Sequence, residues 1–236
     1  MRLLCFPHAG GGASTFDGWA DHAETSVELL VVQAPGREDR ALEVPAESIE
    51  EMADAVAGEL DTWHDRPLAL FGHSFGALVA YEVARRLENR GEAPSLLAVA
   101  GASAPPMIPA VAPLAALDPD AFVKAIVRRG DVPAALLDHP ELLRALLAPV
   151  RADFAALSRY RVGTPTPLTC AVHAIAARSD AKTPVAMMRG WATLTTGPSS
   201  QTVLSGDHRF LTDHTHSVVQ DVTRAVQSAR ASRTAA

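Results

Sequence analysis

Short apolar runs of strand length alternate with amphipathic helical patterns along most of this 236-residue chain. The apolar runs are Arg2–Phe6, Val27–Gln33, Leu68–Gly72, Leu96–Ala100, Leu168–Ala176 and Gln201–Leu204. The clearest helical patterns are Ser48–Trp63, Ala77–Arg90 and His216–Ala229. Strands that alternate with helices are typical of a mostly parallel sheet covered by helices on both faces. The sequence therefore predicts an α/β fold.

The alternation breaks once, between about residues 105 and 163, where prolines begin several apolar helical stretches. Helix starts are indicated at Asp118-Pro119, His139-Pro140 and Ala148-Pro149. Proline is favoured in the first turn of a helix, and aspartate caps helix N-termini well. We therefore expect a single domain over residues 1–236, with a helical lid inserted at about 105–163 and a flexible tail at 229–236.

Composition excludes several classes of protein. Hydrophobic residues make up 48% of the chain, but no uninterrupted apolar run approaches the ~18 residues of a membrane span. The first residues lack the longer apolar segment and cleavage site of a secretory signal, which favours a cytoplasmic location. The net charge of −6 argues against nucleic-acid binding, which requires a basic surface.

The segment Gly72-His73-Ser74-Phe75-Gly76 matches the pattern G-x-S-x-G, in which a serine sits on a sharp turn between a strand and a helix. An apolar strand pattern precedes the segment and a helical pattern follows it, as this motif requires. Side chains at the two glycines would collide with the neighbouring helix and strand. Ser74 is therefore the candidate nucleophile.

A serine nucleophile needs a base and a group that orients the base, and in this fold they follow in the order acid, then histidine. His208 follows the last strand pattern and precedes a helix, so we favour it over His214 and His216 as the base. We expect His73, beside the nucleophile in the sequence, to pack near the site without acting as the base.

Asp180 lies just past the carboxyl end of a predicted strand, where ligand-facing groups gather in α/β sheets, and is the candidate acid. The alternative role for Asp180 is a helix cap before Thr183-Pro184. Asp207 cannot easily reach back to the ring of the adjacent His208, and Asp153 belongs to the helical insertion.

An oxyanion hole requires two backbone N–H groups near the nucleophile. The N–H of Phe75 is one candidate, and the N–H of Ala9 in Pro7-His8-Ala9-Gly10-Gly11-Gly12 is the other. This glycine-rich loop satisfies neither phosphate-binding pattern that such loops commonly carry. We therefore expect no cofactor and no metal site.

Four segments together resemble the type II thioesterases of polyketide synthase and nonribosomal peptide synthetase pathways. They are LLCFPHAGGGASTF, QAPGRE, FGHSFGALVAYEVARRL and the pairing of Asp180 with GDHRFL. The resemblance covers nearly the whole chain and implies an α/β-hydrolase fold with a helical lid. It further implies hydrolysis of acyl or aminoacyl groups from the phosphopantetheine thiol of carrier domains, with Ser74 as nucleophile, Asp180 as acid and His208 as base.

The chain departs from the family pattern at Asp207 and Arg209, where relatives usually carry a glycine and an aromatic residue. A local ion pair between these two side chains is one interpretation. Three other functions stay open: a carboxylesterase acting on free esters, a chain-release or transacylating enzyme, and a non-catalytic protein that binds carrier domains. We expect a monomer whose partners are carrier domains, without nucleic acid or membrane.

Two further expectations concern the substrate. The insertion is rich in large aliphatic residues such as Ile108 and Leu157, and part of this apolar content is expected to line an acyl chamber. Carrier proteins are commonly acidic, so docking would need a local basic patch. Arg128-Arg129 and the set Arg85, Arg86 and Arg90 are candidates, with solvated helix faces as the simpler interpretation.

Overall fold

A computed structural model describes residues 1–63, 65–108, 113–132 and 134–234. The strands are β1 (Arg2–Phe6), β2 (Glu28–Val31), β3 (Leu68–His73), β4 (Leu96–Ala100), β5 (Ala171–Ala177) and β6 (Ser199–Leu204). The α-helices are α1 (Ile49–Glu59), α2 (Phe75–Asn89), α3 (Pro119–Arg128), α4 (Pro140–Arg159), α5 (Val185–Met188), α6 (Phe210–Asp213) and α7 (Thr215–Thr234). Short 3-10 helices occupy Ala13–Phe16, Trp19–Asp21, Glu38–Arg40, Leu60–Thr62, Pro105–Met107, Leu114–Ala116, Ala134–Asp138 and Arg189–Leu194.

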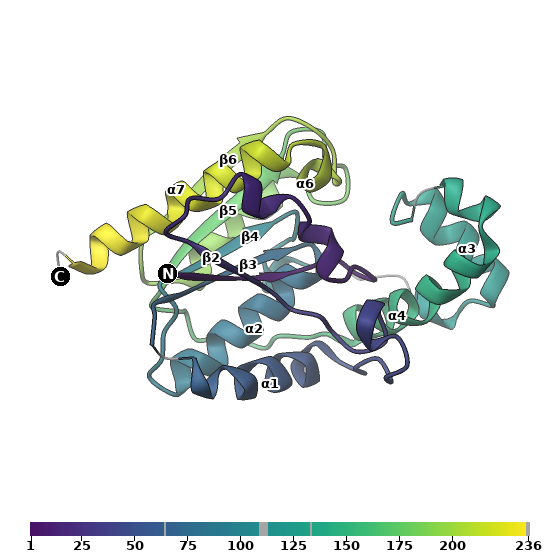
Figure 1. Ribbon diagram of the computed structural model, residues 1–236, viewed down its shortest axis with the longest axis horizontal. Helices are drawn as coiled ribbons and strands as arrows, with labels where there is room; N and C mark the ends of the chain where they lie inside the picture. Colours follow the sequence, from purple (N-terminus) through teal and green to yellow (C-terminus); the bar gives the residue numbers. More distant parts are fainter. Residues whose placement is uncertain (64, 109–112, 133, 235–236) are drawn as a thin grey trace.

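The six strands form one parallel sheet in the order β2-β1-β3-β4-β5-β6. Helices α1 and α2 cover one face, and α7 lies across the other with the loop that follows β1 (Figure 1). Successive residues of a strand point to opposite faces, so Leu4 and Phe6 enter the core under α2 while Leu3 and Cys5 enter the core under α7. The predicted α/β class is confirmed.

Helix α7 is attached to the sheet by a buried polar cluster as well as by apolar contacts. His173 of β5 places Nε2 2.7 Å from Oδ2 of Asp221 on α7, and its Nδ1 lies 2.8 Å from Oγ of Ser200 on β6. Thr202 donates to the other carboxylate oxygen of Asp221 at 3.0 Å. These contacts satisfy polar groups that would be costly to bury alone, so the cluster fixes the position of α7.

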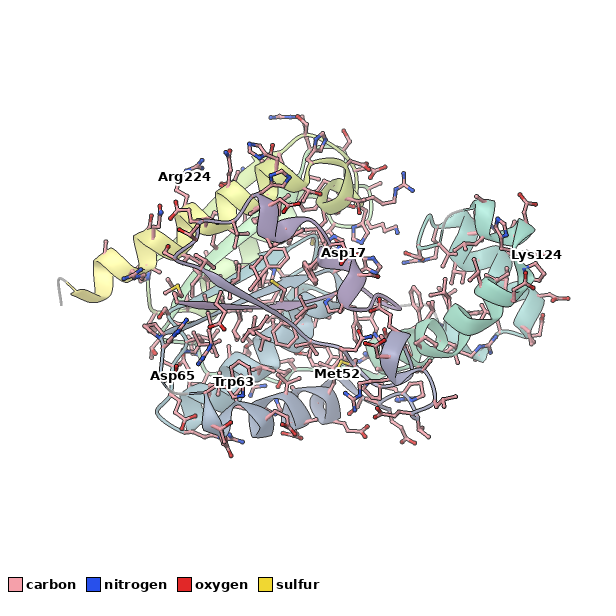
Figure 2. All side chains as sticks on the ribbon, in the orientation of Figure 1. Asp17, Met52, Trp63, Asp65, Lys124 and Arg224 are labelled. Atoms are coloured by element: carbon pink, nitrogen blue, oxygen red, sulfur yellow. The ribbon has the colours of Figure 1, made fainter. Side chains whose placement is uncertain are left out.

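Between β4 and β5, the described residues form helices and loops without a strand. Their apolar side chains build a small separate core from Phe122, Ile126, Val132, Val150 and Phe154. Figure 1 shows α3 standing away from the sheet, with α4 running back toward it, and Lys124 lies on the outer side of this lid (Figure 2). Residues 109–112 and 133 of the expected insertion lie outside the described residues.

One sequence prediction about helix starts differs from the structure. No new helix begins at Ala148-Pro149, because α4 continues through Pro149. Proline removes one backbone hydrogen bond, but burial of Val150 and Phe154 just beyond it keeps the helix whole. The expected tail at 229–236 is helical as far as Thr234, where α7 ends, because Val226 and Ala229 still pack on the core; residues 235–236 lie outside the described residues.

None of the helices in the described part of the chain is long and apolar enough to cross a membrane.

Candidate active site

Ser74 occupies the turn between β3 and α2 with φ +54° and ψ −118°, a backbone conformation that non-glycine residues rarely adopt. Its N–H donates to the carbonyl of Ala100 at the end of β4, at 2.8 Å, which holds the strained turn in place. A Cβ on Gly72 would lie 2.6 Å from the N of Ala77, and one on Gly76 would strike the backbone of Phe6 and Pro7. The two glycines are therefore needed for the helix and strand to pack closely around Ser74.

The structure brings the three predicted catalytic side chains into one hydrogen-bonded chain. His208 Nε2 lies 3.1 Å from Ser74 Oγ, and His208 Nδ1 lies 2.8 Å from Asp180 Oδ2. This is the geometry that general-base activation of a serine requires, with the carboxylate holding the imidazole so that Nε2 faces the hydroxyl.

Asp180 and His208 lie on adjacent loops at the carboxyl ends of β5 and β6. These loops are joined by a hydrogen bond from Ser179 N to Gly206 O at 2.9 Å. Oδ1 of Asp180 accepts the N–H groups of Lys182 at 2.8 Å and Thr183 at 3.0 Å, which fixes the loop after β5. Asp180 is not a helix cap, because α5 begins at Val185 and its N-cap is Pro184.

Asp180 is only 4% exposed, and burial alone would raise its pKa. The hydrogen bond with His208, its positive charge and the two backbone N–H groups outweigh that effect, so the pKa of Asp180 lies below its ordinary value. The carboxylate is therefore ionised at neutral pH and fixes the tautomer of His208.

His73 is buried against the ring of His208 and contacts its backbone. Nε2 of His73 lies 3.2 Å from the carbonyl oxygen of His208 and donates to it in the tautomer that makes this bond. Burial, together with the nearby His208 and His8 rings, holds the pKa of His73 well below its ordinary value. His73 thus stays neutral and helps to hold the loop that carries His208.

The alternative histidines lie elsewhere. His216 is exposed and faces His22, with 3.5 Å between their Nδ1 atoms, and His214 lies beside Gly206. The interpretation of Asp207 and Arg209 as a side-chain ion pair is wrong, because the carboxylate of Asp207 instead accepts the backbone N–H of Arg209 at 2.8 Å. Capping this turn fixes the backbone directly after His208.

The glycine-rich loop after β1 brings Ala9 to the same site. Ala9, Phe75 and Ser74 line one cavity, and among the described residues neither the Ala9 N–H nor the Phe75 N–H has a protein acceptor. The loop makes a tight turn in which Gly11 N donates to His8 O at 2.9 Å and Gly10 has φ +74°. Two unpaired N–H groups beside a serine can stabilise an oxyanion.

Two residues that the sequence did not single out hold this loop. Oδ2 of Asp153, on α4, accepts the N–H of Gly10 at 2.7 Å, and Arg37 donates to Gly11 O at 3.1 Å. Arg37 also pairs with the other oxygen of Asp153 at 3.0 Å. A carboxylate on the face of α4 that also carries the buried Val150 is the one sequence signal that could have identified Asp153.

The cavity at Ser74 has a volume of about 420 Å³. Its apolar wall includes Ile108, Phe154 and Leu157 of the lid, so the expected acyl chamber is lined partly by the insertion. Other large aliphatic residues of the insertion instead pack against the lid's own core, among them Leu114, Leu136, Leu143 and Leu147. At the opening of this cavity, Lys182 pairs with Asp131 of the lid, with 2.6 Å between Nζ and Oδ1.

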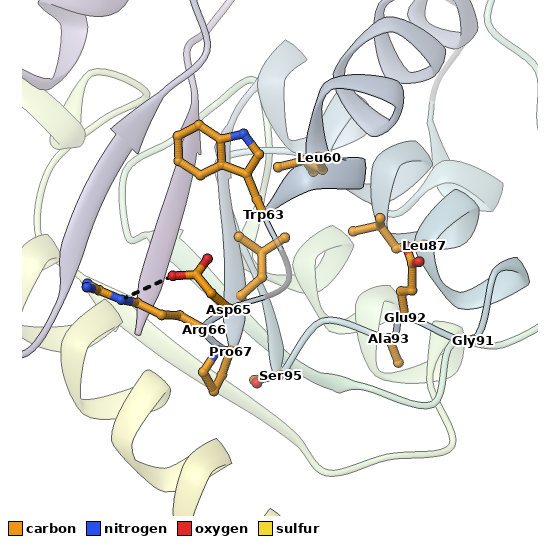
Figure 3. A pocket seen from close by; sticks show the side chains of 11 residues that line it. Leu60, Trp63, Asp65, Arg66, Pro67, Leu87, Gly91, Glu92, Ala93 and Ser95 are labelled. Atoms are coloured by element: carbon orange, nitrogen blue, oxygen red, sulfur yellow. Dashed lines mark ion pairs between the residues drawn. The ribbon is translucent and has the colours of Figure 1, made fainter.

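A second cavity of about 390 Å³ lies at the opposite end of the sheet, around Trp63 and Leu87 (Figure 3). Its charged lining includes the neighbouring Asp65 and Arg66, whose carboxylate and guanidinium groups are 3.6 Å apart. Ligands of parallel α/β sheets bind at the carboxyl ends of the strands, so the cavity at Ser74 is the functional candidate.

The basic side chains proposed for docking are mostly engaged. Arg85 and Arg86 both pair with Glu82 at 2.8 Å, and Arg90 pairs with Asp61 at 2.5 Å. Arg129 pairs with Asp131 at 2.7 Å. Within the described residues, no group of three or more His, Cys, Asp or Glu side chains is arranged to hold a metal ion.

Known thioesterases are similar to this chain in sequence and in fold. Thioesterase PikA5 of Streptomyces venezuelae is 40% identical over 224 residues, covering 94% of this chain and 79% of that protein. The solved RedJ thioesterase from the prodiginine pathway of Streptomyces coelicolor is 36% identical with a TM-score of 0.87, covering 95% of this chain and 85% of that one. YbtT, a type II thioesterase from the yersiniabactin NRPS/PKS pathway, is 30% identical with a TM-score of 0.86, over 97% of this chain and 93% of that one.

The model of the thioesterase domain family matches residues 1–226. With a sheet of the α/β-hydrolase type and a serine, a histidine and an aspartate joined at its carboxyl edge, this chain belongs to the thioesterase domain family.

Proposed function

We propose that this thioesterase hydrolyses acyl or aminoacyl groups from the phosphopantetheine arm of carrier domains in polyketide or nonribosomal peptide assembly lines. Ser74 is the nucleophile, His208 the general base and Asp180 the residue that orients it. The backbone N–H groups of Ala9 and Phe75 form the oxyanion hole.

The observation that carries the proposal is the continuous hydrogen-bonded chain from Ser74 through His208 to Asp180, opening into a cavity with an apolar wall. An apolar wall beside the nucleophile suits an acyl chain. The proposal of a carrier-bound substrate rests on similarity to relatives such as YbtT, a type II thioesterase of an NRPS/PKS pathway.

The reaction proceeds in two acyl transfers. Ser74 Oγ attacks the thioester carbonyl while His208 Nε2 takes the hydroxyl proton, and the Ala9 and Phe75 N–H groups stabilise the oxyanion. The C–S bond then breaks and the thiolate leaves with the proton from His208. Water attacks the resulting serine ester, again with His208 as base, and releases the carboxylic acid and free Ser74.

The proposal also includes a cytoplasmic, monomeric enzyme that uses no cofactor. The reaction needs none, because its nucleophile, base and oxyanion donors are all groups of this chain and its second reactant is water.

Relative rates on an acyl-carrier protein, the same acyl-coenzyme A and a simple aryl ester test the substrate class. We expect the carrier thioester to be hydrolysed with the highest kcat/KM. Preference for the aryl ester would instead indicate a carboxylesterase.

The mass of the product separates hydrolysis from transfer, since an ester or amide product would indicate a chain-release or transacylating enzyme.

Ser74→Ala should lose turnover and remain folded. If wild-type protein bound acyl-carrier protein but neither hydrolysed it nor reacted with a fluorophosphonate, it would be a non-catalytic carrier-binding protein.

A further inference from the structure

The loop that carries Ala9 is held in its conformation partly by side chains from outside the loop. Within the turn His8-Ala9-Gly10-Gly11, one backbone–backbone hydrogen bond runs from Gly11 N to His8 O, Nδ1 of the His8 ring lies 3.1 Å from Ala9 O, and Gly10 adopts a left-handed backbone. Glycine populates many backbone conformations, so such a turn has other accessible shapes that point the Ala9 N–H elsewhere. An oxyanion donor is effective only when it is fixed in advance.

Asp153 and Arg37 each form a hydrogen bond with the backbone of this turn. The carboxylate of Asp153 accepts the N–H of Gly10 at 2.7 Å, and the guanidinium of Arg37 donates to the carbonyl of Gly11 at 3.1 Å. Arg37 and Asp153 are joined to each other at 3.0 Å. The peptide groups directly after Ala9 are therefore held at both a donor and an acceptor by one ion pair.

The ion pair is almost completely buried. Asp153 is 1% exposed and Arg37 is 5% exposed. Away from water, charged hydrogen bonds have strict geometry and few competitors, which makes the pair a rigid support for the turn.

The same helix that supplies Asp153 also forms the wall of the cavity. Phe154 and Leu157 of α4 line the space at Ser74. Val150, one turn before Asp153, lies where a side chain on Gly10 would be. Helix α4 thus touches both the acyl space and the loop of the oxyanion donor, so a shift of the helix must also move Gly10.

We propose that Arg37 and Asp153 are positioning residues that set the oxyanion donor at Ala9 and couple its placement to the seating of lid helix α4. This inference rests on the proposed function of Ser74 and of the Ala9 N–H. A substrate that seats α4 correctly completes the oxyanion hole, and one that displaces α4 weakens it.

Asp153→Asn tests the positioning role most directly, because it removes the negative charge that pairs with Arg37. We expect kcat for an acyl-pantetheine thioester to fall by about 100-fold, the effect of losing one oxyanion donor, with KM changed by about twofold or less. Arg37→Lys keeps the charge but cannot bridge two groups as the guanidinium does, so an intermediate loss of kcat is expected. Asp120→Asn, at an exposed position of α3, is the matched control and should not change kcat.

Two inhibitors distinguish positioning from a general loss of structure. A trifluoromethyl ketone analogue of the substrate forms an oxyanion on Ser74, so its inhibition constant should rise by the same factor as kcat falls in each variant. An amide analogue, with nitrogen in place of the thioester sulfur, resembles the ground state and should bind all variants alike.

Equal weakening of both inhibitors, or an Asp153→Asn enzyme with wild-type kcat, would overturn the positioning role. If Asp153→Asn does not fold, the same two inhibitors are measured on Arg37→Lys, and unchanged ketone affinity there would overturn it. Wild-type protein without activity on any acyl thioester would instead count against the proposed function.

Discussion

Replacement of Asp180 by asparagine isolates the orienting role of this carboxylate from its structural role. Asp180 Oδ1 accepts two backbone N–H groups, and Oδ2 contacts His208 Nδ1 at 2.8 Å. In Asp180→Asn the side-chain oxygen can keep both backbone contacts. The amide nitrogen then faces His208 Nδ1, favouring the tautomer that carries its proton on Nε2, where it cannot accept the proton of Ser74.

The expected effect is large on catalysis and small on stability. The wrong tautomer of the base in a serine triad lowers kcat by roughly 10⁴-fold, which corresponds to about 5.4 kcal/mol of transition-state free energy. The free energy of unfolding at neutral pH should fall only by the contribution of the charged carboxylate, because no backbone donor loses its acceptor. Asp180→Ala, in contrast, leaves two N–H groups without an acceptor and should cost about 1–3 kcal/mol for each that stays buried.

The assay measures kcat on an acyl-pantetheine thioester by thiol release, with the melting temperature of each variant recorded in parallel. Asp207→Asn is the matched control, since Asp207 precedes the base in the sequence but its carboxylate binds the backbone of Arg209. An Asp180→Asn enzyme within tenfold of wild-type kcat would refute the role of Asp180 in orienting His208.

Two further predictions concern stability. Hydrogen bonds lower the pKa of Asp180 in the folded protein, so Asp180 contributes to the free energy of unfolding at pH values above its unfolded pKa of about 3.9. This contribution is lost as the pH falls through the lower pKa of the folded state. Urea unfolding between pH 3 and 6 should therefore show a smaller loss of stability on acidification for Asp180→Asn than for the wild type, and an equal loss would contradict this linkage. Asp221→Ala removes the hydrogen-bond partner of buried His173 and should lower the free energy of unfolding by about 3 kcal/mol while leaving kcat unaltered. A large fall in kcat at a temperature where the variant is folded would show that α7 does more than stabilise the sheet.

The central strands could be predicted from sequence because they are buried on both faces. The predicted run Leu96–Ala100 coincides with β4, whose residues are all buried between two neighbours. At the edge, the predicted run Val27–Gln33 shortens to β2, Glu28–Val31, which pairs with β1 alone and whose register ends with Val31 opposite Cys5. The predicted run Leu168–Ala176 also starts too early, since Leu168 makes only an isolated bridge with Thr195 before β5.

Ser74, His208 and Asp180 could be identified because each occupies a position defined by a strand end and by its order along the chain. The hydrogen bonds of Asp153 and Arg37 with the glycine-rich loop could not be predicted, because they join three segments that are far apart in the sequence. Local sequence around Asp153 shows an amphipathic helix and gives no indication of which loop that helix packs against. The path of α4 through Pro149 escaped prediction for a similar reason, since tertiary burial beyond the proline decides it.

Mass spectrometry of the enzyme during turnover shows directly whether Ser74 carries the acyl group. The protein is mixed with an acyl-carrier protein, quenched with acid during turnover, and digested to locate any adduct. We expect one acyl group on Ser74 in the wild type, which accumulates when deacylation is slower than acylation. With Ser74→Ala we expect neither adduct nor released acid. Release of the acid by Ser74→Ala at the wild-type rate would contradict this role of Ser74.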